Sequence, residues 1–476
     1  MHILNVGKNG TFSQNGAVTS SPQEVDDFIQ SLLTTNPQRL AVHFHGGLVG
    51  EQSGIDTANR MKQQFEMAGA IPLTVVWETD LVTTIRDNLT SINNTTLFQK
   101  ILHYVIKVAG RRAGLPGAKG GVEWDSPSIE AERATEEPFA ELDAAFRQEG
   151  ITAKSVGTAD PNFPRLEKDV EEEFRQRLAA DRALTELLQD EAPKTDLLNP
   201  DYRQFDREGA DAKGIFETLK LAVPLAKIVV RVIRRIWNRR DHGFYATVVE
   251  EILRELYLAN FAAWVWGGMK TKAHAMFENN NGRPQAELRA GTYLFDRLAQ
   301  VQAETKLPIY LSGHSAGAIA IAELLDSLGN QTVLRFPSVQ LLAPALRNDQ
   351  FQRTFVSNNR SPAVGNFRCF TMSDDAEKKE RLFNPLYTRS LLYFISGVLE
   401  PDEVDMPIIG MQRFLFGRAP FDTPDHLAVN AFMDGNTVYS PSPAAAPAGQ
   451  RTHALKHGDF DNDLPTLESL RYWIER

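Results

Sequence analysis

The stretch LPIYLSGHSAGAIAIAELLDSLG, residues 307–329, joins a buried strand to a helix through the pentapeptide Gly-His-Ser-Ala-Gly. Residues 307–313 predict a strand, and residues 316–329 predict a helix that ends on a glycine. A turn this sharp strains the backbone of its central residue, Ser315, and lifts the side chain off the sheet. Glycines at 313 and 317 are needed because a Cβ there would collide with the adjoining strand and helix. His314 is too close to Ser315 along the turn to act as its base, so a packing or hydrogen-bonding role is expected.

The segments on both sides of this turn alternate between strand and helix patterns. Residues 39–45 and 72–77 predict strands, with a helix at 55–69 between them. Residues 338–345 and 366–373 predict further strands, and residues 464–475 predict a terminal amphipathic helix. A helix is also expected from Ser21-Pro22 to about residue 34, after a short β-hairpin. Strands separated by helices indicate an α/β fold with a mostly parallel central sheet flanked by helices.

Residues 81–284 interrupt this rhythm with a helical, strand-poor pattern, which predicts a large insertion between residues 1–80 and 285–476. Within it, residues 96–112 and 215–240 are basic and amphipathic. They are expected either to pack against each other as a helical hairpin, or to form a cap or lid that contacts anionic lipid. Pro224 would kink the longer segment and could serve as a hinge.

Composition limits the classes of protein that this chain can represent. The 476 residues carry a net charge of -10, which argues against nucleic-acid binding. A run of eighteen apolar residues and a signal peptide are both missing, and the one cysteine, Cys369, cannot form an internal disulfide. These features predict a cytoplasmic protein, with Cys369 as a small core residue. The sequence shows no zinc-ligand spacing and no phosphate-binding or dinucleotide-binding glycine loop, so no metal or cofactor is expected.

The G-H-S-A-G turn between a strand and a helix resembles the nucleophile elbow of the α/β-hydrolase superfamily, and in particular its lipase and esterase branch. The resemblance covers roughly residues 1–80 and 285–476. It implies that Ser315 is the nucleophile and that the backbone N–H of Ala316 stabilises an oxyanion. It also implies a second donor in the turn His45-Gly46-Gly47, with Gly47 preferred and Gly46 as the alternative. Here the turn reads HGGL rather than the longer HGGG, which leaves that donor open.

The same resemblance implies an acid and then a base, in that chain order, after the elbow. The predicted acid is Asp374, the first acidic residue after the strand at 366–373, with Asp375 as the alternative or as a helix cap. The predicted base is His457, which stands before a glycine and the terminal helix. His453 is the second choice for the base, and His426 is an outside candidate. In the HGG turn and its strand, His45 is expected to buttress the loop and His43 to be buried.

These residues together predict a serine hydrolase that cleaves a carboxylic ester through an acyl-enzyme, as an esterase or a lipase does. An amidase, a peptidase or an acyltransferase would use the same residues. In a different class, the chain would be a non-catalytic module that binds a membrane or a protein. No cofactor is implied, and the expected partner is a small-molecule or lipid ester, with peripheral membrane contact through the basic helices.

Overall fold

The computed structural model divides the chain into two compact units, which are described separately. The first unit comprises Met1–Thr84, Val265–Glu380 and Pro407–Arg476, and the second comprises Ile85–Trp264 and Arg381–Met406. The structure describes residues 2–46, 50–77, 81–113, 140, 143, 162–181, 183, 220–257, 261–329, 334–357, 363–401 and 404–476.

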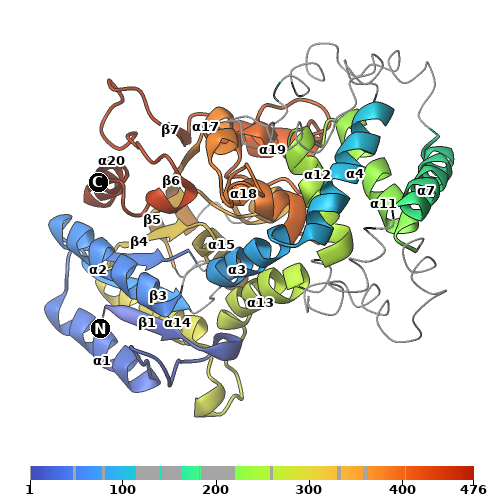
Figure 1. The fold of residues 1–476 in the computed structure, drawn as a ribbon. Helices are drawn as coiled ribbons and strands as arrows, with labels where there is room; N and C mark the ends of the chain where they lie inside the picture. The colour runs from blue at the N-terminus through green and yellow to red at the C-terminus, as the bar shows by residue number, and fades with distance from the viewer. Residues whose placement is uncertain are drawn as a thin grey trace. The chain divides into compact units, whose positions relative to one another are not determined.

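The first unit is built on a sheet of seven parallel strands in the order β1-β3-β2-β4-β5-β6-β7 (Figure 1). The strands are β1 Ile3–Val6, β2 Leu40–Phe44, β3 Ile71–Trp77, β4 Ile309–His314, β5 Phe336–Leu342, β6 Val364–Met372 and β7 Thr437–Ser440. Most of their residues are buried, as expected where helices cover a parallel sheet. The predicted α/β architecture with a parallel central sheet is therefore confirmed.

Alternate residues of β2 face two different helical layers. Ala41 belongs to a buried cluster with Phe65 of α2 (Glu51–Met67) and Leu470 of α20 (Leu464–Glu475), two helices that contact each other. Phe44 lies on the opposite face, where its ring stacks on Phe295 of α14 (Ala290–Thr305) at 6.2 Å. Helix α14 in turn contacts α1 (Pro22–Thr35). Both faces of the sheet are thus covered, and polar side chains gather at the ends of its strands.

Two predictions about strands need correction. The expected N-terminal hairpin is absent from the described residues, because β1 pairs in parallel with β3 and only an isolated bridge links Val6 to Phe12. Strand β7 was not predicted. It has four residues and runs into Ser440-Pro441, so its pattern is too short to separate from the proline-rich loop that follows.

The described part of the second unit is helical and contains no strand. Helix α11 (Ala222–Trp237) contacts α4 (Thr96–Arg112), α7 (Phe163–Ala180) and α12 (Phe244–Ile252). The two basic amphipathic segments therefore pack against each other through α4 and α11. Pro224 lies in the first turn of α11, where proline needs no hydrogen-bond partner. The predicted kink at Pro224 is wrong for this reason.

The remaining elements are short or join the two units in sequence. The α-helices are α3 Leu81–Asn93, α13 Phe261–Met276, α15 Gly317–Leu328, α16 Asn348–Phe351, α17 Asp374–Lys379, α18 Leu391–Phe394 and α19 Pro424–Met433. The tighter and wider helical turns are η1 Lys8–Gly10, η4 Leu253–Tyr257, η5 Gln285–Glu287, η6 Gln352–Val356, η8 Ile395–Leu399, η9 Gln412–Leu415 and η10 His457–Asp459. Among the described helices, none combines the length and hydrophobicity that crossing a bilayer requires.

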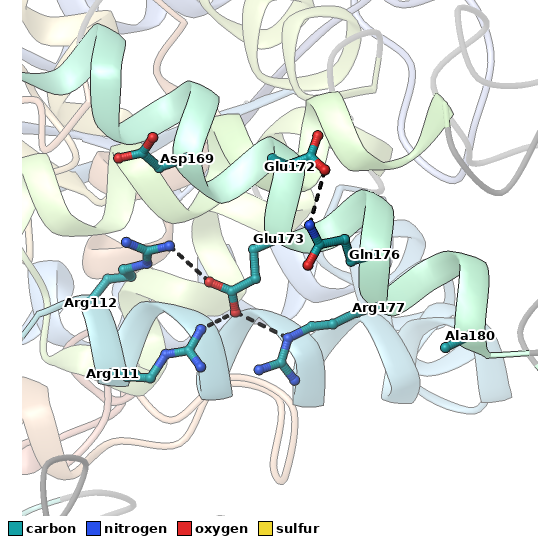
Figure 2. Close-up of a pocket in the computed structure, with 8 residues that line it drawn as sticks. All are labelled: Arg111, Arg112, Asp169, Glu172, Glu173, Gln176, Arg177 and Ala180. Carbon is teal, nitrogen blue, oxygen red and sulfur yellow. Dashed lines mark hydrogen bonds and ion pairs between the residues drawn. The ribbon is translucent and has the colours of Figure 1, made fainter.

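The cations of α4 and α11 are paired with acidic residues inside the second unit. Glu173 of α7 accepts from Arg111 and Arg112 of α4 and from Arg177 of its own helix, which closes one side of a charged hollow between the helices (Figure 2). Lys100 lies 3.2 Å from the carboxylate of Asp181. On α11, Arg231 pairs with Glu255 at 2.7 Å and Arg235 with Glu251 at 3.1 Å. These pairs join helices that lie far apart in the sequence.

Candidate active site

The turn after β4 holds Ser315 in the left-handed region, with φ of 51°. Its backbone N–H donates to the carbonyl of Leu342 at 2.8 Å, and its own carbonyl accepts from Ala345 at 3.0 Å. A Cβ on Gly317 would stand 2.1 Å from the carbonyl oxygen of Phe44, and one on Gly313 would stand 2.8 Å from Ile321. The two glycines are therefore required for β4, β2 and α15 to approach each other. A non-glycine residue with positive φ at the end of a central strand is the strain that a nucleophile elbow needs.

Only one of the three candidate histidines faces Ser315. Nε2 of His457, in η10, lies 2.8 Å from Oγ of Ser315, although the two residues are 142 positions apart. His453 is exposed, and the Nδ1 atom of His426 bonds to Thr423 in the cap of α19. The structure thus brings together Ser315 and His457 in the geometry of a nucleophile and its base.

His314 anchors the loop that carries His457. Its Nε2–H donates to the backbone carbonyl of His457 at 2.9 Å, and its Nδ1 lies 3.3 Å from a carboxylate oxygen of Asp461. Burial acts to lower the pKa of His314, but the Asp461 carboxylate outweighs this effect and the net shift is upward. For His457 itself, burial and the neighbouring charge of His314 lower the pKa well below its usual value, against an opposing effect of Asp461. His457 is therefore neutral at pH 7, as a general base must be.

The carboxylates at 374 and 375 are not hydrogen-bonded to His457. The Asp374 carboxylate pairs with Lys378, and its backbone N–H donates to Oε1 of Gln412 at 2.8 Å. Asp375 is exposed. Nδ1 of His457, the atom that an orienting acid would contact, is buried and has no hydrogen-bond partner among the described residues. Strand β6 ends at Met372 and Ser373 caps α17, so both aspartates enter the first turn of a helix, where the helix dipole favours carboxylates.

Two buried carboxylates that the sequence did not single out lie beside His457. Oε2 of Glu380 accepts from the backbone N–H of His457 at 3.1 Å. Burial raises the pKa of Glu380 to about 7, a shift that the His457 hydrogen bond opposes and the carboxylate of Asp459 reinforces. Asp461 contacts His314 and accepts from Thr57 at 3.3 Å, and its pKa is lowered by these partners in spite of burial. The sequence offered a weak signal for Asp461 in its position four residues after His457, and none for Glu380.

The backbone around Ser315 supplies candidate oxyanion donors. Ala316 lies at the N-terminus of α15, where backbone N–H groups have no intrahelical acceptor. A Cβ on Gly46 would stand 3.2 Å from Cβ of Ser315, so the backbone of Gly46 runs beside the nucleophile. Gly47, the preferred second donor, lies outside the described residues.

The two histidines of β2 and its turn have structural surroundings. Nδ1 of His45 bonds to the carbonyl of Gly46 at 2.8 Å, and its Nε2 accepts from the Trp77 backbone at 3.2 Å, so the ring braces the turn. Nδ1 of His43 lies 2.9 Å from Oγ of Ser312 on the next strand. Burial lowers the pKa of His45 to about 4 and that of His43 to about 3, so both rings are neutral. In the described part of the chain, no group of three His, Cys, Asp or Glu residues is arranged to hold a metal ion.

Comparison with known proteins adds no relative to this geometry. No family model matches the chain, no curated protein is similar to it, and no solved structure matches it. The site is therefore interpreted from its own residues.

The close contact at Gly317 leads to a direct prediction. Substitution G317A would force a methyl group against the carbonyl of Phe44, so we expect the protein to lose about 1–3 kcal/mol of stability and most of its activity. The control is G268A in α13, where a Cβ has no atom within 4 Å. Because alanine favours helices, G268A is expected to match or exceed the wild-type melting temperature. Equal melting temperatures for the two variants would contradict the tight elbow.

Proposed function

We propose that this protein is a serine hydrolase that cleaves a carboxylic ester, with Ser315 as nucleophile and His457 as base. One observation carries the proposal. The Nε2 atom of His457 lies 2.8 Å from Oγ of a serine whose backbone is held at φ 51° in a strand-to-helix turn. A folded protein gains nothing from that strain for stability alone, and such strain is concentrated at functional sites.

The chemistry follows from the positions of these atoms. His457 removes the proton from Ser315 as Oγ attacks the acyl carbonyl, and the resulting oxyanion accepts from the N–H groups of Ala316 and the glycine turn at Gly46 and Gly47. The imidazolium then gives its proton to the departing alcohol, which leaves an acyl-serine. Water attacks this ester with the same histidine as base, and the carboxylic acid and free serine are released. All proton transfers pass through Nε2 of His457.

The order of the strands supports placing the protein among the α/β-hydrolases. The elbow follows β4, the central strand of the sheet, and the glycine turn follows its neighbour β2. His457 lies in a loop between β7 and the last helix, α20. Ligands of open parallel sheets bind at the carboxyl ends of the strands, where these three segments meet.

Labelling with a fluorophosphonate probe tests the proposal. A serine activated by His457 should form a stable phosphonyl ester, and peptide mass spectrometry should locate it at Ser315. A panel of p-nitrophenyl esters of increasing chain length, with matched anilides, then distinguishes an esterase or lipase from an amidase or peptidase. An acyltransferase would need an added alcohol or amine for full turnover. A protein that is neither labelled nor active on any of these substrates would instead be a binding module.

For the helical unit we propose a structural role rather than a lipid contact. Arg111, Arg112 and Lys100 of α4 and Arg231 of α11 have carboxylate partners, so they are less available to anionic lipid. We therefore predict that anionic vesicles leave the esterase activity within twofold of its value in buffer, and that the protein does not float with them at low salt. Flotation that weakens as salt rises would favour the lid and membrane contact instead.

A further inference from the structure

The imidazole of His457 lacks a partner on the nitrogen that faces away from Ser315. Nδ1 is buried with no hydrogen-bond partner, whereas Nε2 is occupied by the serine hydroxyl. If Nε2 is to accept the serine proton, the ring's own proton must be on Nδ1. A buried N–H without an acceptor costs roughly 1–3 kcal/mol, and an imidazolium formed there without an anion costs more. Catalysis therefore requires an acceptor for Nδ1–H.

We propose that the carboxylate of Glu380, not that of Asp374, orients His457 and balances its charge during turnover. This inference rests on the proposed function of Ser315 and His457. Oε2 of Glu380 already accepts from the backbone N–H of His457 at 3.1 Å, which holds the carboxyl group beside this residue. Glu380 follows α17 directly, and its side chain has three rotatable bonds. A rotation of the side chain brings a carboxylate oxygen to Nδ1 without movement of either backbone.

The other nearby carboxylates have different partners. Asp461 binds His314 and Thr57 and lies 4.0 Å from Arg60. Asp459 accepts from the backbone N–H groups of Leu455 and Lys456, at 3.2 and 3.0 Å. Asp374 pairs with Lys378 on its own helix. The one interaction that the structure gives Glu380 is with His457, so its charge is available for the imidazolium.

The surroundings of Glu380 make its charge dependent on pH near neutrality. Burial raises the pKa of this carboxyl to about 7, with Asp459 acting in the same direction, while the His457 N–H and Lys456 act in the opposite direction. His314 and Asp461 are the other charged groups near His457. Glu380 is therefore ionised above pH 7 and protonated below it. Since the pKa of His457 itself lies well below its usual value, the acid limb of activity should follow Glu380 rather than His457.

The substitution E380Q separates an orienting role from a merely structural one. Glutamine has an oxygen in the same place and still accepts from the His457 backbone, but it cannot carry the negative charge. We expect E380Q to lower kcat by at least a hundredfold, towards the roughly 10⁴-fold loss seen when the orienting aspartate of a serine protease is replaced by its amide. E380D should recover part of the activity. D374N should lose at least tenfold less than E380Q, because Asp374 pairs with Lys378.

The pH profile and the labelling rate are the measurements that decide the proposal. In the wild-type protein, ester hydrolysis and fluorophosphonate labelling of Ser315 should both fall as pH drops through about 7, and in E380Q this limb should disappear. An E380Q variant that keeps the wild-type rate and profile overturns the role of Glu380 and leaves the proposed function intact. The same holds if D374N is the more damaging variant. A wild-type protein that the probe does not label overturns the proposed function and this inference together.

Discussion

Replacing Ser315 with alanine is expected to abolish ester hydrolysis while leaving the protein folded. The hydroxyl forms the covalent bond to the acyl group, and loss of such a nucleophile lowers kcat by up to about 10⁶-fold in a serine protease of the same type. Alanine has the same Cβ at the strained φ of 51°, so the backbone cost of the turn is unchanged. Purified S315A should match the wild-type melting temperature and fail to react with the fluorophosphonate.

The matched control is S327A, a serine-to-alanine change in the helix that follows the elbow. Ser327 is exposed, and its hydroxyl donates to the carbonyl of Leu324 within α15. Its removal should leave both activity and labelling at the wild-type level. If purified S315A retains more than about a hundredth of the wild-type rate, in contrast to the loss expected for a nucleophile, Ser315 is not the nucleophile.

The fold and half of the site could be predicted from the sequence because their signals are local. The strand before Gly313 and the helix after Gly317 are contiguous segments with clear hydrophobic patterns. The glycines between them have a steric reason that does not depend on the rest of the fold. His457 could be selected because a histidine followed by glycine, directly before a terminal helix, is a pattern readable in a few residues. The structure places this residue against Ser315.

The orienting acid could not be predicted in the same way, because burial of a carboxyl depends on segments far apart in the sequence. Asp374 follows a strand, as an acid of this type should, yet Ser373 makes that position the start of a helix. Glu380 closes the charged run AEKKE, which reads as solvated surface. It becomes buried where it meets the backbone of His457, 77 positions away. The pairing of α4 cations with α7 acids was hidden for the same reason, since Arg112 and Glu173 are 61 positions apart.

The largest stability effect is expected in the second unit, at Glu250. This buried carboxylate lies 2.6 Å from Nη2 of Arg235, 2.7 Å from Nδ1 of His242 and 2.6 Å from the hydroxyl of Tyr387. His242 also contacts Asp405 at 2.6 Å through Nε2, so its two ring nitrogens both donate to carboxylates. Substitution E250Q keeps the shape of the side chain and removes the anion. Breaking a buried ion pair from one side typically costs about 3–5 kcal/mol, and we expect a loss of this size.

The pH dependence identifies the cause of that loss. Burial acts to raise the pKa of Glu250, but His242 and Arg235 outweigh it and lower the value to about 2, against 4.5 for the unperturbed group. A depressed pKa contributes stability that is present above pH 4.5 and disappears as pH falls towards 2. The difference in stability between wild type and E250Q should therefore be constant near pH 7 and shrink steadily below pH 4.5. Hydrogen exchange of the α12 amides would measure it within the second unit alone. The control E171Q breaks an exposed pair with Arg175 on α7, which should cost less than about 1 kcal/mol. Equal losses for E250Q and E171Q would mean that the buried cluster does not stabilise the unit.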